Sequence, residues 1–567
     1  MPMFHADVDK VVLSPEFRQY LAETLLELCA IDTTPRSDLR QFADAERRVF
    51  DAIEARLKCL DLPGLTLSRV PINPDIQQHA FYSRPYHTIT SDHPQEKSAG
   101  ETYAGRCNLV VTLDGTAGNT GGLALDAHID VVKPYIAPRR EGNILFGRGA
   151  CDDKGPLVSI VGAVRLVSQH LKRAGRRLTK PLTLMFVIEE EMGGNGSLSL
   201  AMDLSLRSRY DTQVVLECCS SNIYPANRGA VWYKVEACID GVNLFETAAF
   251  IIEEMEREGR AIRAESRHEL FPHRPAQTCH GILGNFGEHP SRICGRVDFL
   301  IQPADSATNL ASALPLIHDI LDDGLAQYIA VYGDKTKTID PATGKPKVAR
   351  HYEVETMARE LVVRVHGASG HMGAILQNDG AITKMASMMR ALVTSRDAIE
   401  RAAGGRARFT LHNWPDASHL LMEGGQGFLP THPMSQIMDR LRQAVWRGVR
   451  RHLALVGRPD IDPTSAFAVT FDKLHNASFA GDPHSPAMQS AISAAKAAGI
   501  WKDDQAIRGW DVSCDARIFA CEYPDLTVLT TGPGHLIHAH ADDEQIDLDE
   551  LSCFTGFLSR FILDQTL

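Results

Sequence analysis

Residue types that bind metals or transfer protons follow several apolar segments of this sequence. The run GLALDAH ends in His128, with Asp130 two residues later, and the run QVVLE ends in Glu217. The run LTLMFVI leads directly into three successive glutamates, and the run DLTVLTTG leads toward His540. A histidine after one strand is commonly structural, and a run of glutamates is commonly solvated. The repetition of such residues after apolar runs instead indicates a site with chemistry.

The stretch GRGACDDKG adds two adjacent aspartates, Asp152 and Asp153, between a glycine-rich turn and an apolar helical segment. Stabilisation of acidic residues by the helix dipole is the simplest explanation of this pair. However, two histidines and three carboxylates also form a suitable ligand set for zinc. One carboxylate can bridge two metals about 3.5–4 Å apart, as in many hydrolases. These residues therefore favour a metal site of the hydrolytic type.

The segments around these residues alternate between strand and helix patterns. Continuous apolar strands that alternate with helices predict an α/β sheet buried on both faces. Ligands of such sheets bind at the carboxyl ends of the strands, which is where the candidate residues stand. The predicted strands are 108–113, 122–128, 182–188, 213–217 and 525–532, and the predicted helices are 14–30, 44–60 and 155–171; residues 71–103 are expected to be irregular.

The alternation stops near residue 228 and resumes near residue 465, so a second domain is expected inside the first. The first domain would comprise 1–228 and 465–567, and the inserted α+β domain would comprise 229–464. Inside the insert, VWYKVEACIDGVNLFETAAFIIEEM and LVVRVHGASGHMGAILQNDGAITKMASMM share the order strand, glycine turn, helix. We therefore expect a duplicated insert, with halves at about 229–332 and 351–464.

The composition limits the classes of partner. The chain has 567 residues and a formal net charge of −12, which disfavours a nucleic-acid or anionic membrane surface as partner. No apolar stretch reaches the roughly 18 residues that a membrane span requires, and the N-terminus lacks the pattern of a secretory signal. The 12 cysteines are scattered, as expected for reduced thiols in the cytoplasm. We expect a cytoplasmic protein with a small-molecule substrate.

Taken together, the motifs resemble those of the di-zinc aminoacylase and carboxypeptidase family. This family includes acetylornithine deacetylase, succinyl-diaminopimelate desuccinylase, glutamate carboxypeptidase and carnosinase-like dipeptidases. The motifs occur in the family order and cover both parts of the first domain. They are HID at His128 and Asp130, GRGACDDKG at Asp152, EEMGGNGS at Glu190 and Glu191, the later acid Glu217, and AHADDE at His540.

The resemblance implies a zinc-exopeptidase-like catalytic domain, with a mostly parallel mixed sheet, and an inserted lid domain. It also implies two zinc ions, for which cobalt and manganese are alternatives. His128 and Glu217 would bind one ion, Glu191 and His540 would bind the other, and Asp152 would bridge the two. Asp153 would then point elsewhere.

Further roles follow from the same resemblance. Glu190 would be the general base, and Asp130 would hold the His128 ring. His371, in GASGH, would stabilise the oxyanion, although it could also be a turn histidine. This residue comes from the partner subunit in dimeric relatives and from a duplicated lid in some dipeptidases. We hypothesise a monomer with a pseudo-dimeric lid, with a homodimer as the alternative. Arg517 would contact a substrate carboxylate or form a structural ion pair.

Four cysteines fall beside these motifs: Cys151, Cys218, Cys219 and Cys514. We interpret them as small core residues. The alternative is that they make the site sensitive to oxidation or to heavy metals.

The implied activity is metal-dependent hydrolysis of an amide bond next to a carboxylate. A dipeptidase or carboxypeptidase-like exopeptidase is the first hypothesis, because the insert is long and suggests a duplicated lid. A deacylase of N-acyl or N-carbamoyl amino acids is the alternative. A catalytically silent binding protein on the same fold is a third, but retention of Glu190 argues against it, since a silent protein needs no base.

Overall fold

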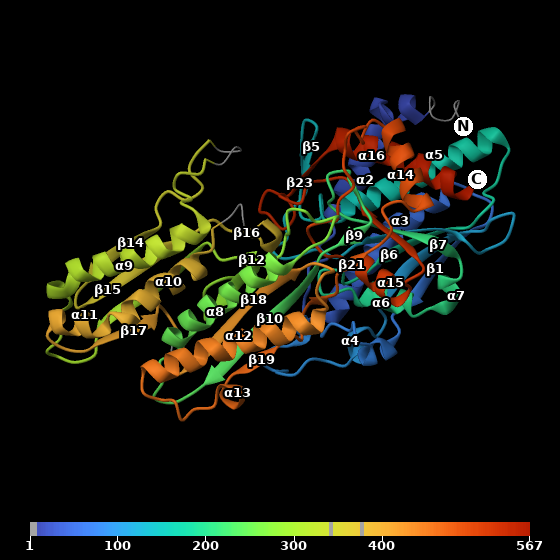
Figure 1. Cartoon of the computed structure of the whole chain (residues 1–567). Coiled ribbons are helices and arrows are strands. Elements are labelled where there is room, and N and C mark those ends of the chain that lie inside the picture. Colours follow the sequence, from blue (N-terminus) through green and yellow to red (C-terminus); the bar gives the residue numbers. More distant parts are fainter. Residues whose placement is uncertain (1–7, 340–343, 375–378, 415) are drawn as a thin grey trace. The chain divides into compact units, whose positions relative to one another are not determined.

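The computed structural model describes residues 8–339, 344–374, 379–414 and 416–567 (Figure 1). The chain divides into two compact units. Within the described residues, no helix is both long enough and apolar enough to cross a membrane.

The two units interleave along the sequence. Unit 1 extends through Gly229 and also contains His268–Pro272 and Lys473–Leu567, and unit 2 contains Ala230–Arg267 and His273–Asp472. The main breaks, after Gly229 and after Asp472, lie beside the expected domain boundaries. The assignment of the units as catalytic domain and lid stays a proposal.

Unit 1 is built on a seven-stranded mixed sheet in the order β1-β2-β6-β3-β7-β22-β8. The four strands β6, β3, β7 and β22 run parallel, and the outer strands pair antiparallel. This confirms the predicted mixed α/β fold. The strands are β1 (Leu65–Pro71), β2 (Cys107–Leu113), β3 (Gly122–His128), β6 (Leu182–Val187), β7 (Tyr210–Leu216), β8 (Ile223–Tyr224) and β22 (Thr527–Thr531).

Helices cover this sheet, and its central strands are buried throughout. Every residue of β3 and β6 is buried, which requires cover on both faces. Helix α5 (Lys154–Ala174) packs on β3 together with α16 (Leu548–Thr566), and α2 (Pro15–Cys29) joins this group. Helix α15 (Ala516–Glu522) contacts α6 (Asn195–Ala201), β7 and β22.

One predicted helix starts earlier than its apolar pattern indicates. The helix expected at 44–60 is α3 (Leu39–Lys58), five residues longer at its start. The Asp38 side chain accepts hydrogen bonds from the backbone N–H groups of Arg40 and Gln41, and this cap sets the start.

The remaining elements of unit 1 are short. Residues 71–103, expected to be irregular, contain only single turns. The short elements are η1 (Pro74–Gln78), η2 (Tyr86–Thr88), α4 (Ala99–Thr102), β4 (Arg139–Glu141), β5 (Ile144–Phe146), α7 (Leu204–Arg207), β9 (Ala226–Asn227), β20 (His475–Asn476), β21 (Phe479–Ala480), α14 (Pro486–Ala497) and β23 (Gln545–Asp547).

Unit 2 contains two sets of four strands that share one strand order. The outer copy has the order β11-β18-β10-β19, and the inner copy has the order β14-β15-β13-β17. Numbered along the chain within each copy, both orders read 2-3-1-4. The outer copy consists of β10 (Gly229–Cys238), α8 (Leu244–Glu265), β11 (Thr278–Leu283), β18 (His419–Phe428), α12 (Met434–Leu455), α13 (Pro463–Ala466) and β19 (Ala468–Thr470).

The inner copy lies in the sequence between β11 and β18. This nesting differs from two consecutive halves, because a division into 229–332 and 351–464 would cut both copies. The inner copy and its flanking elements are β12 (Arg292–Ile293), β13 (Arg296–Pro303), α9 (Leu310–Tyr332), β14 (Tyr352–Met357), β15 (Glu360–His366), β16 (Gly370–His371), η3 (Met372–Ala374), α10 (Ala381–Thr394), α11 (Arg396–Ala403) and β17 (Ala407–Leu411).

The helices of the outer copy, α8 and α12, lie side by side over its sheet (Figure 1). Their close approach depends on Gly448 in α12. A Cβ atom at this position would lie 2.6 Å from both the Ile251 Cα and the Phe250 carbonyl oxygen of α8. These are backbone atoms, which cannot move aside as a flexible side chain can.

We predict that Gly448→Ala destabilises unit 2, since overpacking of this kind costs about 1–3 kcal/mol. The better helix propensity of alanine offsets about 1 kcal/mol of that cost. Thermal unfolding followed by circular dichroism should show a lower Tm. Gly295→Ala is the control, because its Cβ would meet Ser369 at an ordinary 3.4 Å. Equal Tm values for the two variants would contradict the close helix contact.

Candidate metal centre

The parallel strands of unit 1 bring the predicted metal ligands to one edge of the sheet. His128 is the last residue of β3, and Glu217 directly follows β7. Glu191 lies in the turn after β6, and His540 lies in the long loop after β22. Because β6, β3, β7 and β22 are parallel neighbours, their carboxyl ends meet at this edge.

A first group of donor atoms contains His128, Asp152 and Glu217, all buried. The His128 Nε2 atom lies 3.1 Å from Asp152 Oδ1 and 3.9 Å from Glu217 Oε1. One ligand atom from each residue lies within 4.8 Å of the others. Their mixture of nitrogen and oxygen donors suits zinc.

A second group contains Asp152, Glu191 and His540, and it meets the same distance limit. The His540 Nε2 atom lies 3.0 Å from Glu191 Oε1 and 3.3 Å from Asp152 Oδ2. The two oxygens of Asp152 therefore face different histidines. This is the arrangement that a carboxylate bridging two metals requires.

The Asp130 carboxylate contacts both the first group of donor residues and the turn after β6. Its two oxygens accept hydrogen bonds from the backbone N–H groups of Glu190 and Glu191, each at 3.1 Å. Asp130 also lies beside the His128 ring, with its carbonyl oxygen 3.0 Å and its carboxylate 3.5 Å from Nδ1. One side chain thus orients a ligand of the first group and the turn that presents Glu191.

Glu544 fixes the loop that carries Asp152. Its Oε1 atom accepts hydrogen bonds from the backbone N–H groups of Gly149, Cys151 and Asp152 at 3.0–3.1 Å. Its other oxygen pairs with Arg148 at 2.5 Å in a buried contact. The sequence placed Glu544 at the end of the AHADDE motif but indicated no role for it, because its partners are backbone groups far away in the chain.

Asp153 points away from Asp152 and contributes to positioning. Its Oδ2 atom accepts a hydrogen bond from the His128 backbone N–H at 3.1 Å. The side chain makes no capping hydrogen bond at the start of α5. The adjacent aspartates thus serve different purposes, one at the candidate metal site and one on the backbone of a ligand residue.

Glu189, the first of the three successive glutamates, is fully buried rather than solvated. It accepts hydrogen bonds from Tyr103 and from Arg106, whose Nη1 atom is 2.6 Å away. Arg106 also pairs with the buried Glu46 at 2.6 Å. The Glu189 backbone has a φ of +64°, a left-handed conformation at the start of the turn. Sequence reasoning missed this network, because its members lie in separate segments.

Crowding of carboxylates raises several pKa values in the centre. Burial, together with the charges of Asp152 and Glu190, raises the pKa of Glu217 well above its usual range. Burial and the charge of Asp515 raise the pKa of Glu190, and burial raises that of Glu191. The site therefore holds more negative charge than its protein groups compensate, as expected of a site that binds cations.

The pKa values of the two histidines are also raised, whereas the pKa of Asp152 is lowered. Burial lowers the pKa of His128 and His540, but the surrounding carboxylates outweigh it and raise both values. Burial raises the pKa of Asp152, but its hydrogen bonds with the two imidazole rings lower it overall.

Glu190 belongs to neither donor group, although it directly precedes Glu191. Its side chain is half-buried, and only its backbone is bound by Asp130. A general base must remain uncoordinated, so this position is compatible with that role.

Arg517 contacts the turn that follows Glu191. The side chain is buried and donates a hydrogen bond from Nη2 to the Gly193 carbonyl at 2.8 Å. A Cβ atom at Gly194 would lie 2.2 Å from Asp515 Oδ1, so this part of the turn requires glycine. These contacts are structural, and the predicted contact of Arg517 with a substrate carboxylate stays a prediction.

His371 belongs to unit 2, where its backbone pairs with Arg292 in the short β12–β16 ladder. Its side chain lies outside the described part of the structure. Its predicted role therefore stays a prediction.

The four cysteines beside the motifs, Cys151, Cys218, Cys219 and Cys514, are all buried and free. Burial and the charge of Glu217 raise the pKa of the Cys219 thiol well above its usual range. A protonated, buried thiol is a poor nucleophile, in agreement with their interpretation as core residues.

We predict that Asp130→Asn lowers zinc affinity by about 10–100-fold, the usual cost of losing a residue that orients metal ligands. An amide keeps only one acceptor oxygen for the two N–H groups of Glu190 and Glu191. Zinc affinity would be measured by competition with a chromogenic chelator. Asp114→Asn, which alters the carboxylate that pairs with Arg209 and is about half exposed, is the matched control. An unchanged affinity in Asp130→Asn would show that Asp130 does not support the ligands.

Two solved structures share this fold across nearly the whole chain. Human carnosine dipeptidase 1 matches with a TM-score of 0.53 and 12% identity over 99% of this chain and 98% of that chain. The di-peptidase Dug1p from Saccharomyces cerevisiae matches with a TM-score of 0.53 and 11% identity over 99% and 97%. At these identities the similarity shows the fold alone.

Sequence similarity extends to curated proteins and to a family. A putative [LysW]-lysine/[LysW]-ornithine hydrolase of Pyrobaculum aerophilum is 29% identical over 217 residues, or 36% of this chain. The match spans 58% of that relative's length. Residues 124–564 match the family described as Peptidase family M20/M25/M40. Because this match covers most of the chain and contains every predicted ligand, the chain belongs to peptidase family M20/M25/M40.

Proposed function

We propose that this chain is a two-zinc hydrolase that cleaves an amide bond next to a carboxylate. The observation that carries the proposal is the position of Asp152 between two donor groups. One of its oxygens faces His128 and the other faces His540, with Glu217 and Glu191 completing the two groups. Cobalt and manganese would also accept these ligands.

In this proposal, bound zinc supplies a water molecule acidified enough to react near neutral pH. The Glu190 carboxylate accepts the proton of that water and later donates it to the departing amide nitrogen. Asp130 keeps Glu190 in place through its backbone N–H.

We propose a dipeptide or other short peptide as the substrate. The duplicated topology of unit 2 supports this choice, because a duplicated lid is the feature that favoured dipeptides in the sequence. An N-acyl or N-carbamoyl amino acid is the second candidate. The name of the Pyrobaculum relative, putative [LysW]-lysine/[LysW]-ornithine hydrolase, is compatible with hydrolysis in either case.

We predict that Glu190→Gln lowers kcat by at least about 100-fold, because a general base contributes about 10²–10⁴-fold to the rate. The zinc-loaded protein would be incubated with pooled dipeptides and N-acyl amino acids, and depletion would be followed by mass spectrometry. The depleted compounds identify the substrate class.

The variant should retain its zinc, since Glu190 lies outside both donor groups, whereas the comparison variant His540→Ala should lose part of it. Equal depletion by wild type and Glu190→Gln would exclude this base. Absence of depletion by the zinc-loaded wild type would favour a silent binding protein.

We further propose that His371 stabilises the oxyanion and does so within its own chain. His371→Ala should then lower kcat by about 10²–10³-fold, the usual cost of losing one oxyanion donor. The exposed His484 provides the control variant, His484→Ala. An unchanged kcat in His371→Ala would exclude the role.

Mixing the two inactive variants distinguishes action within one chain from action between subunits. If His371 acts in its own chain, a mixture of Glu190→Gln and His371→Ala stays inactive. In a homodimer that exchanges this residue, mixed dimers would combine one intact Glu190 with one intact His371 and regain activity. Recovery of activity would therefore contradict the pseudo-dimeric lid.

A further inference from the structure

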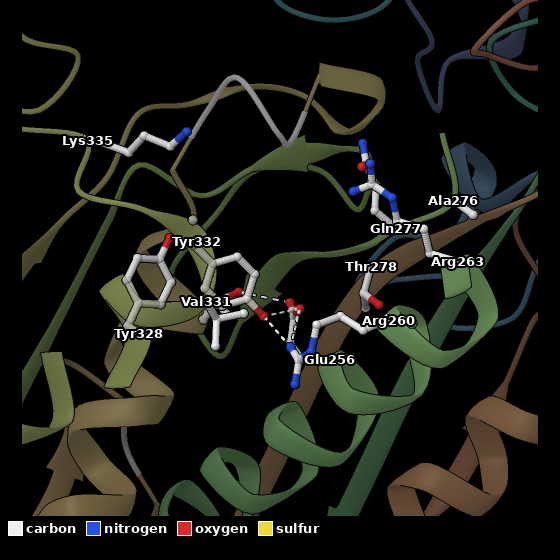
Figure 2. Close-up of a pocket in the computed structure, with 13 residues that line it drawn as sticks. Glu256, Arg260, Arg263, Ala276, Gln277, Thr278, Tyr328, Val331, Tyr332 and Lys335 are labelled. Atoms are coloured by element: carbon white, nitrogen blue, oxygen red, sulfur yellow. Dashed lines mark hydrogen bonds and ion pairs between the residues drawn. The ribbon is translucent and has the colours of Figure 1, made fainter. Parts of the chain in front are cut away.

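A pocket within unit 2 lies apart from every residue of the candidate metal centre. It is formed by the C-terminal half of α8, the end of α9, the segment entering β11 and the start of α10 (Figure 2). Its cavity volume is about 160 Å³. An engineered protein cavity of about 150 Å³ binds benzene, so this space suits a ligand of about six to nine heavy atoms.

Charged side chains of both signs line this pocket. Arg260, Arg263 and Lys335 supply positive charge, and Glu256 is the one acidic residue among its described lining residues. The Arg263 guanidinium donates a single weak hydrogen bond, of 3.3 Å, to the His273 carbonyl among the contacts described. The lining thus offers cations for an anionic group and one carboxylate for a cationic group.

Glu256 is held firmly in place. It accepts hydrogen bonds from the Tyr332 hydroxyl and from the Thr383 hydroxyl, the latter at 3.3 Å. Arg260 lies 3.8 Å from Glu256 and donates to the Tyr332 hydroxyl at 2.9 Å. Figure 2 shows Tyr332 and Arg260 beside the Glu256 carboxylate. The negative end of the pocket is therefore preorganised.

Gln277 supplies an acceptor without a partner. The side chain is about nine-tenths buried on the pocket wall, and its Oε1 atom has no hydrogen-bond partner among the described residues. Its Nε2 atom donates to the Gly373 carbonyl at 3.2 Å. Of the two terminal atoms of Gln277, only Nε2 can donate a hydrogen bond to this carbonyl. The positions of the amide nitrogen and the amide oxygen are therefore determined. A buried acceptor left unpaired is destabilising, and a ligand N–H group would satisfy it.

We propose that this pocket binds a free α-amino acid of small or medium size. The carboxylate would pair with the Arg263 guanidinium, with Lys335 adding positive charge to the lining, and the ammonium group would donate to Gln277 Oε1, which lies on the side of Arg263 (Figure 2). Tyr328 and Val331 provide an apolar wall for the side chain. A simple anion would leave Gln277 unpaired, and a simple cation would face the guanidinium groups, so the lining fits a zwitterion better than either.

Isothermal titration calorimetry on the zinc-loaded full chain tests this proposal. The probes would be L-alanine, L-serine, L-threonine and L-aspartate, with acetate and methylamine as single-charge ligands. At least one amino acid should bind more tightly than both single-charge probes. Arg263→Gln should weaken that binding by at least about tenfold, since hydrogen bonds to charged groups contribute about 1.5–3 kcal/mol.

Three further variants test whether the amino acid binds in this pocket. Lys335→Gln provides a second test if Arg263→Gln unfolds, and Arg257→Gln, on α8 but outside the pocket, should bind like wild type. His540→Ala should retain the binding. Loss of binding in His540→Ala but not in Arg263→Gln would place the amino acid at the metal centre and overturn the proposal. Absence of binding up to about 10 mM in wild type would also overturn it.

Discussion

The geometry of the candidate centre depends on the fixed position of one loop, the loop that carries Asp152. A carboxylate can face two histidines at once only if its backbone cannot rotate away. The Glu544 carboxylate accepts three backbone N–H groups of this loop, and it pairs with Arg148 in a buried contact. Several hydrogen bonds to one ionised group are strong in a region of low dielectric constant. They replace the flexibility expected of a glycine-rich turn with a single conformation.

Buried charged side chains also fix the backbone on the other side of the centre. Backbone N–H groups of the turn after β6 are bound by Asp130, and the preceding Glu189 is bound by Arg106 and Tyr103. A buried ion pair contributes little net stability because desolvation of the two charges is costly, but it strongly disfavours other arrangements of its partners. The charged groups behind the centre therefore specify geometry more than they stabilise the fold. That role explains why so many buried charges accumulate in one part of unit 1.

The residues of the candidate centre could be proposed from the sequence, because each follows an apolar strand or stands in a family motif. His128, Asp152, Glu191, Glu217 and His540 fall within the two donor groups. The supporting residues were not predictable in the same way. Glu544 and Glu189 act on backbone or charged groups that are 80 to 400 positions away, and no local spacing encodes such partners. The nesting of unit 2 escaped prediction for a related reason, since a strand–turn–helix pattern does not reveal which strands pair.

Because the inner copy is nested between two strands of the outer copy, the outer sheet could be closed without it. The inner copy leaves the outer sheet after β11 and returns at β18, and these two strands are antiparallel neighbours in which Leu283 pairs with Met422. Both ends of the inner copy therefore emerge at one place, and a hairpin turn of about two to five residues could close the outer sheet without it. Such a shortened chain would expose the face of α8 that now meets α10 through the Glu253–Arg390 pair. The inner copy can thus be regarded as a module inserted between two neighbouring strands of the outer sheet.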